Sequence, residues 1–142
     1  MSNNPSPQFT AVLKFYEAIG FWKFDVLEKL FSEEYTSTTL PASANQPVRD
    51  KRQGIAYAKT FGGALGYAPL KYEIFQFIEG AGKIWAHSRF YNDDIKFNSE
   101  SVFIFSLSSG DDIKITGVHD FIDTKLAADF AAAAAASAQA KQ

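Results

Sequence analysis

The sequence predicts an α+β fold in which three N-terminal helices wrap a curved antiparallel sheet. Apolar residues recur at helical spacing mainly between residues 8 and 65 of the 142-residue chain, whereas residues 70–123 contain four segments with the alternation typical of strands. Polar turns separate these four segments, as expected of a meander. Because the helices and the meander occupy different halves of the chain, the class is α+β, and a sheet curved around such helices leaves a cone with an open mouth.

Three helices and one lone strand are predicted before residue 66. The first helix begins near Gln8, after the start signal Ser6-Pro7, and ends at Gly20. The second spans about residues 24–31 and is followed by a short strand, 35–40, and a proline-containing loop, 41–47. Asp50 is expected to cap the third helix, residues 51–65.

The four later strands are expected at residues 70–79, 83–91, 99–107 and 113–123. A Gly80-Ala-Gly82 hairpin joins the first two. In the second strand, one face carries Ile84, Ala86, Ser88 and Phe90, and the other carries Trp85, His87, Arg89 and Tyr91. Both faces are partly apolar, which indicates that both are covered, one by the helices and the other by a second copy of the chain. We therefore expect a homodimer formed through the outer face of the sheet.

The chain is predicted to form one domain, residues 8–130, that closes with a short helix at 124–130. Residues 1–7 are expected to be a disordered lead. The alanine-rich tail, residues 131–142, has no apolar stripe and is expected to be frayed or disordered.

Composition excludes several classes of protein. The net charge of -2 with interspersed signs argues against a nucleic-acid partner. The absence of cysteine excludes disulfides and thiolate chemistry, and nothing in the sequence suggests a cofactor or metal site. No segment resembles a signal peptide or a membrane span of roughly 18 apolar residues, so we expect a soluble cytoplasmic protein. Aromatic residues make up 15% of the chain, enough to line an apolar cavity as well as a core.

Asp120 is the strongest candidate for chemistry. Period-two alternation places it on one face of the last strand with Val118 and Ile122, and such apolar neighbours would raise the pKa of its carboxyl group toward that of a general base. The structural alternative is an ion pair of Asp120 with Arg89 or Lys71.

Three further residues are candidates. Tyr16 on the first helix could donate a hydrogen bond to a ligand oxygen inside the cone, or it could simply pack helix against sheet. His87 shares a face with Trp85, which is either cavity wall or dimer surface. His119 should face away from Asp120.

Three segments resemble a known superfamily: residues 12–19 (VLKFYEAI), 26–34 (VLEKLFSEE) and 115–123 (ITGVHDFID). The first two resemble the opening helix pair, and the third the closing strand, of nuclear-transport-factor-2-like (NTF2-like) proteins. That group includes SnoaL-like polyketide cyclases, ketosteroid isomerases and scytalone dehydratases. The resemblance covers about residues 8–130 and implies the cone fold, which hosts many chemistries.

The resemblance transfers few catalytic residues. Tyr16 matches the oxyanion-hole tyrosine of ketosteroid isomerases. Their aspartate base is replaced here near Thr39, Leu40 and Pro41, and their second acid falls near Phe103. The buried late-sheet acid of SnoaL-like cyclases has its nearest match in Asp120.

The resulting hypothesis is binding of a small apolar metabolite in the cone. If the protein is an enzyme, we expect a cofactor-free isomerase, cyclase or dehydratase acting next to a carbonyl, with Asp120 as base, Tyr16 as oxygen donor and His87 as proton relay. The predicted substrate wall consists of Trp85, Phe103, Phe105, Val118 and Phe61. The alternative is a non-catalytic ligand-binding or dimeric interaction module of the same fold. A cavity of several hundred Å³ around Asp120 would favour the enzyme, and a filled cone the alternative.

Overall fold

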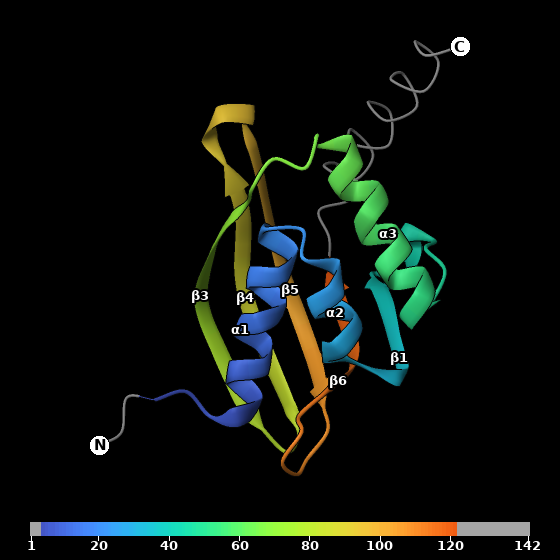
Figure 1. The fold of residues 1–142 in the computed structure, drawn as a ribbon, viewed down its shortest axis with the longest axis vertical. Helices are drawn as coiled ribbons and strands as arrows, with labels where there is room; N and C mark the ends of the chain where they lie inside the picture. Colours follow the sequence, from blue (N-terminus) through green and yellow to red (C-terminus); the bar gives the residue numbers. More distant parts are fainter. Residues whose placement is uncertain (1–3, 122–142) are drawn as a thin grey trace.

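A computed structural model describes residues 4–121 as three α-helices packed on one face of a six-stranded sheet (Figure 1). In chain order the elements are α1 (Pro7–Gly20), α2 (Phe24–Leu30), β1 (Phe31–Leu40), β2 (Arg49–Asp50), α3 (Lys51–Ala64), β3 (Lys71–Gly80), β4 (Lys83–Asn92), β5 (Phe97–Leu107) and β6 (Ile115–Phe121). Short 3-10 turns follow β1 (Ala42–Ala44) and β4 (Asp93–Ile95). The predicted helix at 124–130, the tail at 131–142 and the first three residues of the lead lie outside the described residues.

The helix boundaries follow the signals expected from the sequence. At the start of α1, the Ser6 hydroxyl accepts a hydrogen bond from the Phe9 amide at 3.0 Å, and Pro7 occupies the first position. At its end, a Cβ on Gly20 would lie 2.4 Å from the Leu70 carbonyl oxygen, so the close approach of the chain there requires glycine. Asp50 caps α3 through a capping box.

The predicted boundary between the second helix and the first strand was wrong. Phe31 was assigned to the second helix, but β1 begins there. Phe31 is buried and its ring stacks on Tyr35 with 3.9 Å between centroids. The register of β1 against β6 is irregular between Phe31 and Thr36, the segment in which the two rings stack.

The strand order is β2-β1-β6-β5-β4-β3. The antiparallel meander β3-β4-β5-β6 is confirmed. The sheet as a whole is mixed, however, because β1 pairs in parallel with β6. The long connection through α3 lets β1 join the free edge of the meander in the same direction as β6, which a direct hairpin could not do.

The register defines which residues share a face. Ala86, Phe103, Asp120 and Thr39 are consecutive partners across β4, β5, β6 and β1. This row faces the helices, because Ala86 is fully buried and the residues on either side of it in β4 are more exposed. The inner face of the sheet therefore carries Asp120, and the outer face carries the neighbouring residues of each strand.

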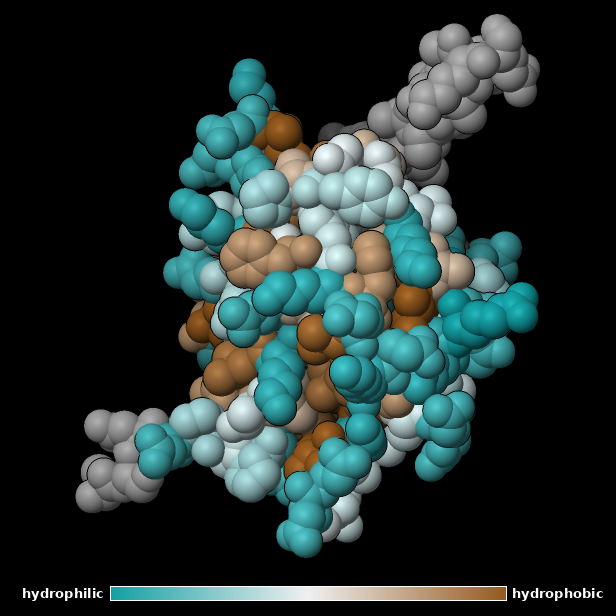
Figure 2. Space-filling view, viewed as in Figure 1, coloured by the Kyte–Doolittle hydropathy of each residue, from teal (hydrophilic) through white to brown (hydrophobic). Residues whose placement is uncertain are grey.

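The helices cover the inner face unequally. In Figure 1, α1 lies across β3, β4 and β5, while α3 stands beside β1 at the other side of the sheet. Figure 2 shows this helix side of the molecule, where hydrophilic residues cover most of the surface and hydrophobic ones appear between them. Within residues 4–121, no helix has the length and apolar character needed to cross a membrane.

Candidate functional site

A cavity of about 120 Å³ lies inside the cone, between the inner face of the sheet and the helices. Its apolar wall includes Phe15, Leu27, Phe31, Phe103 and Val118. Its polar end is formed by Tyr35, Ser37 and Thr39 of β1, Arg49 of β2, Tyr57 of α3 and Asp120 of β6. The cavity thus combines an apolar body with one polar pole, the usual composition of a small-molecule site.

Asp120 is the acid of this polar pole. Its backbone lies between Phe103 of β5 and Thr39 of β1, and the residue is half-buried. Burial raises the pKa of the Asp120 carboxyl above its ordinary value, although a hydrogen bond with the Thr39 side chain and the positive charge of Arg49 partly oppose the rise. The shift is in the direction that favours general-base catalysis by this carboxyl group.

Tyr35 stands next to Asp120 and is held firmly. Its ring is stacked on Phe31. Gly54 of α3 packs close to the Tyr35 ring, since a Cβ added at Gly54 would lie 3.2 Å from a carbon of that ring. Burial raises the pKa of Tyr35, and the nearby charge of Asp120 adds to the effect. The hydroxyl group therefore stays protonated beside the acid.

Arg49 is the cation of the pole. It pairs with Ser37 across β1 and β2, which places it on the face of β1 that carries Thr39. Its guanidinium lies 4.0 Å from the centre of the Tyr57 ring, and Nη2 donates to Gln46 Oε1 at 3.0 Å. Because Arg49 belongs to β2 and not to α3, its side chain borders the cavity.

Tyr16 does not line this cavity. Its side chain is fully buried between α1 and the sheet, and its hydroxyl oxygen lies 2.6 Å from the hydroxyl oxygen of Ser88. Aromatic rings of Tyr72, Phe90 and Phe103 surround it. This is the helix-to-sheet packing that the sequence left open as the alternative.

The structure also separates His87 and Trp85 from Asp120. Both lie on the outer face, because they alternate with the buried residues of β4. His87 Nε2 is 2.5 Å from Glu100 Oε1. His87 and Trp85 line a shallow hollow of about 300 Å³ on the outer face. A proton relay from His87 to Asp120 would have to cross the sheet, so this geometry does not support it.

The remaining predicted residues divide between cavity and core. Phe103 and Val118 line the cavity. Phe105 is fully buried against Phe15, and Phe61 packs on Trp22 and Phe97, so neither borders the cavity.

The structure also tests the alternative ion pair of Asp120 and the predicted orientation of His119. The proposed ion pair of Asp120 with Arg89 or Lys71 is absent, since Arg89 binds Glu73 at 3.0 Å and Lys71 is exposed at the start of the edge strand β3. His119 is exposed on the outer face, as expected.

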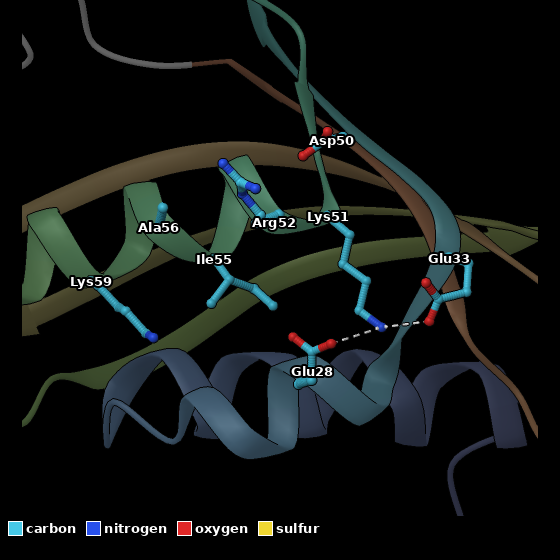
Figure 3. A pocket seen from close by; sticks show the side chains of 8 residues that line it. All are labelled: Glu28, Glu33, Asp50, Lys51, Arg52, Ile55, Ala56 and Lys59. Atoms are coloured by element: carbon cyan, nitrogen blue, oxygen red, sulfur yellow. Dashed lines mark hydrogen bonds and ion pairs between the residues drawn. The ribbon is translucent and has the colours of Figure 1, made fainter.

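Other hollows of the described surface are larger than the cavity in the cone. One of them, a groove of about 520 Å³, lies between α2 and α3, where Lys51 is held between Glu28 at 3.3 Å and Glu33 at 3.2 Å (Figure 3). Both carboxylates that flank Lys51 are engaged by its ammonium group, so they offer less to a ligand than the acid in the cone does. Among residues 4–121 no cluster of three or more histidine, aspartate or glutamate side chains could hold a metal ion.

Solved structures with the same fold support the resemblance seen in the sequence. An NTF2-like protein of unknown function from Cytophaga hutchinsonii is 15% identical, with 88% of this chain and 97% of that chain covered and a TM-score of 0.63. The BvnE pinacolase from Penicillium brevicompactum is 16% identical, with 96% and 97% covered and a TM-score of 0.72. A putative SnoaL-like polyketide cyclase from Jannaschia is 13% identical, with 89% and 94% covered and a TM-score of 0.65. No protein family model and no curated protein matches the sequence. The chain has the NTF2-like fold.

Proposed function

We propose that this protein binds a small, largely apolar molecule in the cone and that Asp120 transfers a proton to or from it. The reaction class is a cofactor-free isomerisation, cyclisation or elimination next to a carbonyl group. The observation that carries the proposal is a desolvated carboxyl group at the single polar pole of an apolar cavity. The fold is compatible with such chemistry, since two proteins that share it are described as a pinacolase and a putative polyketide cyclase.

The cavity limits the size of the group that enters it. An engineered cavity of about 150 Å³ in another protein holds benzene, so a cavity of about 120 Å³ suits a group the size of one six-membered ring. Phe15, Phe103 and Val118 would contact the apolar body of the ligand and keep water away from Asp120.

In the forward step, the Asp120 carboxylate would accept a proton from the carbon next to the carbonyl group. The electron pair of the broken carbon–hydrogen bond would form a carbon–carbon double bond, and the carbonyl oxygen would take up the negative charge. Returning the proton to another carbon gives an isomer, and closing a bond gives a ring. General-base catalysis of this kind contributes typically about 10² to 10⁴ in rate.

The test is proton exchange with simple ketones, which does not require the natural substrate to be known. Cyclohexanone and 2-cyclohexenone are incubated with the protein in D₂O, and deuterium incorporation next to the carbonyl is followed by NMR. Asp120→Asn keeps the shape of the side chain and should slow exchange about 10²-fold or more. Asp112→Asn, an exposed acid paired with Lys114, is the matched control. Equal exchange rates for the wild type and Asp120→Asn would disprove the assignment.

A non-catalytic binding module is the second candidate. The small cavity favours it, because ligand pockets usually measure about 300–1,000 Å³, and so does the engagement of the Tyr16 hydroxyl with Ser88. In that case the ring compounds would bind without any exchange above the solvent rate.

We also propose a homodimer formed through the outer face of the sheet. Ile78 is 73% exposed and Trp85 48% exposed on that face, with Phe75 and Phe121 also exposed. Such a cluster of large apolar side chains is typical of a surface that is covered by a partner.

A further inference from the structure

Arg49 is the feature of the cavity that the proposed proton transfer leaves unexplained. Asp120 could exchange a proton without it, yet the half-exposed Arg49 borders the same cavity. The chain builds a two-residue strand, β2, whose pairing with β1 directs Arg49 to the polar pole.

The guanidinium is fixed in position but has donors to spare. The Tyr57 ring covers one of its faces at 4.0 Å, and within residues 4–121 a single hydrogen bond ties Nη2 to Gln46. A guanidinium carries five N–H donors. Within residues 4–121 no carboxylate forms a salt bridge with Arg49, whereas Lys51 two residues later has two such partners.

Asp120 is near enough to feel this charge without forming an ion pair with it. Arg49 lowers the pKa of Asp120, yet the two side chains make no salt bridge. Both line the same cavity. A ligand oxygen lying between them would accept hydrogen bonds from Arg49 while the adjacent carbon or oxygen of the ligand faces Asp120.

We propose that Arg49 forms an oxyanion subsite, and that the ligand is a ring-sized molecule with an anionic oxygen, either a carboxylate or an enolate formed during the reaction. This inference rests on the proposed function and names its substrate class. In the step described above, the proton passes from carbon to Asp120 and the electron pair moves onto the carbonyl oxygen, where Arg49 stabilises the negative charge. Arg49 thus takes the role that the sequence suggested for Tyr16.

Binding of matched probes tests the charge preference. Benzoate is compared with benzamide for the carboxylate, and 4-nitrophenolate with nitrobenzene for the enolate, by calorimetry at pH 8. Charge-assisted hydrogen bonds are strong, so each preferred anion should bind about 10-fold to 100-fold more tightly than its neutral counterpart. A preference for benzoate alone identifies a carboxylate ligand, and one for 4-nitrophenolate alone identifies an enolate.

Two variants with the same charge change separate the subsite from a general effect of charge. Arg49→Gln should abolish the preference for the anion. Arg52→Gln removes a cation three residues away that is exposed in the groove between α2 and α3, and should leave the preference intact (Figure 3). Arg49→Lys keeps the charge without the planar fork and should retain a reduced preference.

The outcomes are distinct from those of the exchange experiment. Asp120→Asn removes a like charge and should bind the anions more tightly, although it slows exchange. If the anion preference persists in Arg49→Gln, or if the wild type binds the neutral probes equally well, the oxyanion subsite is wrong even where Asp120 is the base. If the preference for anions is lost in Arg49→Gln but the rate of proton exchange does not depend on Asp120, the oxyanion subsite is supported and the assignment of Asp120 as the base is wrong.

Discussion

The two faces of the sheet come from the same strands, yet one is buried under helices and the other is partly exposed. On β4 the inner residues Ile84, Ala86 and Ser88 are buried under α1, while Trp85 on the outer side is about half exposed. Both faces carry large apolar side chains, so apolar content does not distinguish them. The faces differ in what covers them, because the three helices within residues 4–121 pack on the inner face, where Asp120 and Arg49 line the cavity.

The largest expected difference between the faces concerns stability. Phe105 of the inner face is fully buried and packs on Phe15 with 5.1 Å between ring centres. Phe105→Ala should lower the free energy of unfolding by about 3–5 kcal/mol. Trp85→Ala on the outer face should cost the monomer about 1 kcal/mol or less. Urea denaturation at low protein concentration measures both, and equal losses would contradict the assignment of the two faces.

The outer face should matter for assembly instead. Ile78→Lys places a charge at the most exposed apolar residue of the proposed dimer surface, and should weaken association by about 2 kcal/mol, about 30-fold in Kd. Val48→Lys, at an exposed residue of the loop before β2, serves as the control. Light scattering follows the mass relative to the 15.7 kDa chain. A wild-type protein that is monomeric at micromolar concentration would disprove the dimer.

The elements of the fold could be predicted because their signals lie within a few residues of each other. Parts of the site could not, because they depend on contacts between residues far apart in the sequence. Ser6-Pro7 and Asp50 mark their helix starts within a few residues, and alternation alone puts Val118 and Asp120 on one face. The partner of Tyr16, by contrast, lies 72 residues away on β4. No local pattern indicates that its hydroxyl is taken by Ser88.

The polar pole illustrates the same limit. Tyr35, Ser37 and Thr39 recur at every second position, a signal that could have suggested one polar face of a strand. Arg49 offered no such signal, because its position depends on β2 pairing with β1 and β1 pairing in parallel with β6. Alternation also could not tell which face of β4 is inside, since both carry aromatic residues.

The Tyr16–Ser88 contact gives a smaller and more specific test of the inner face. Removing either hydroxyl leaves the other buried without a partner, so Tyr16→Phe and Ser88→Ala should each cost about 1–3 kcal/mol. The double variant should cost less than the sum of the two, because no unpaired group remains. Thermal or urea denaturation of the four proteins gives this coupling energy, and simple additivity would show that the hydroxyls do not depend on each other.

The smallest expected effect concerns the acid at the polar pole and its dependence on pH. In the unfolded chain the carboxyl of Asp120 titrates near its ordinary pKa of 3.8, whereas burial raises its pKa in the folded protein, with Arg49, Tyr35 and His119 as the titratable groups around it. Below pH 3.8 the group is neutral in both states, and its contribution to stability is fully present. As the pH rises through the folded pKa, that contribution is lost, because ionisation then costs more in the folded state.

Asparagine does not titrate, so Asp120→Asn should gain stability relative to the wild type between acid and neutral pH. Urea denaturation at a series of pH values measures the difference, with Asp112→Asn at an exposed turn as the control. A difference that stays constant or shrinks toward neutral pH would mean that the carboxyl is not desolvated, and the outer and inner faces would then not differ in the way that the cavity requires.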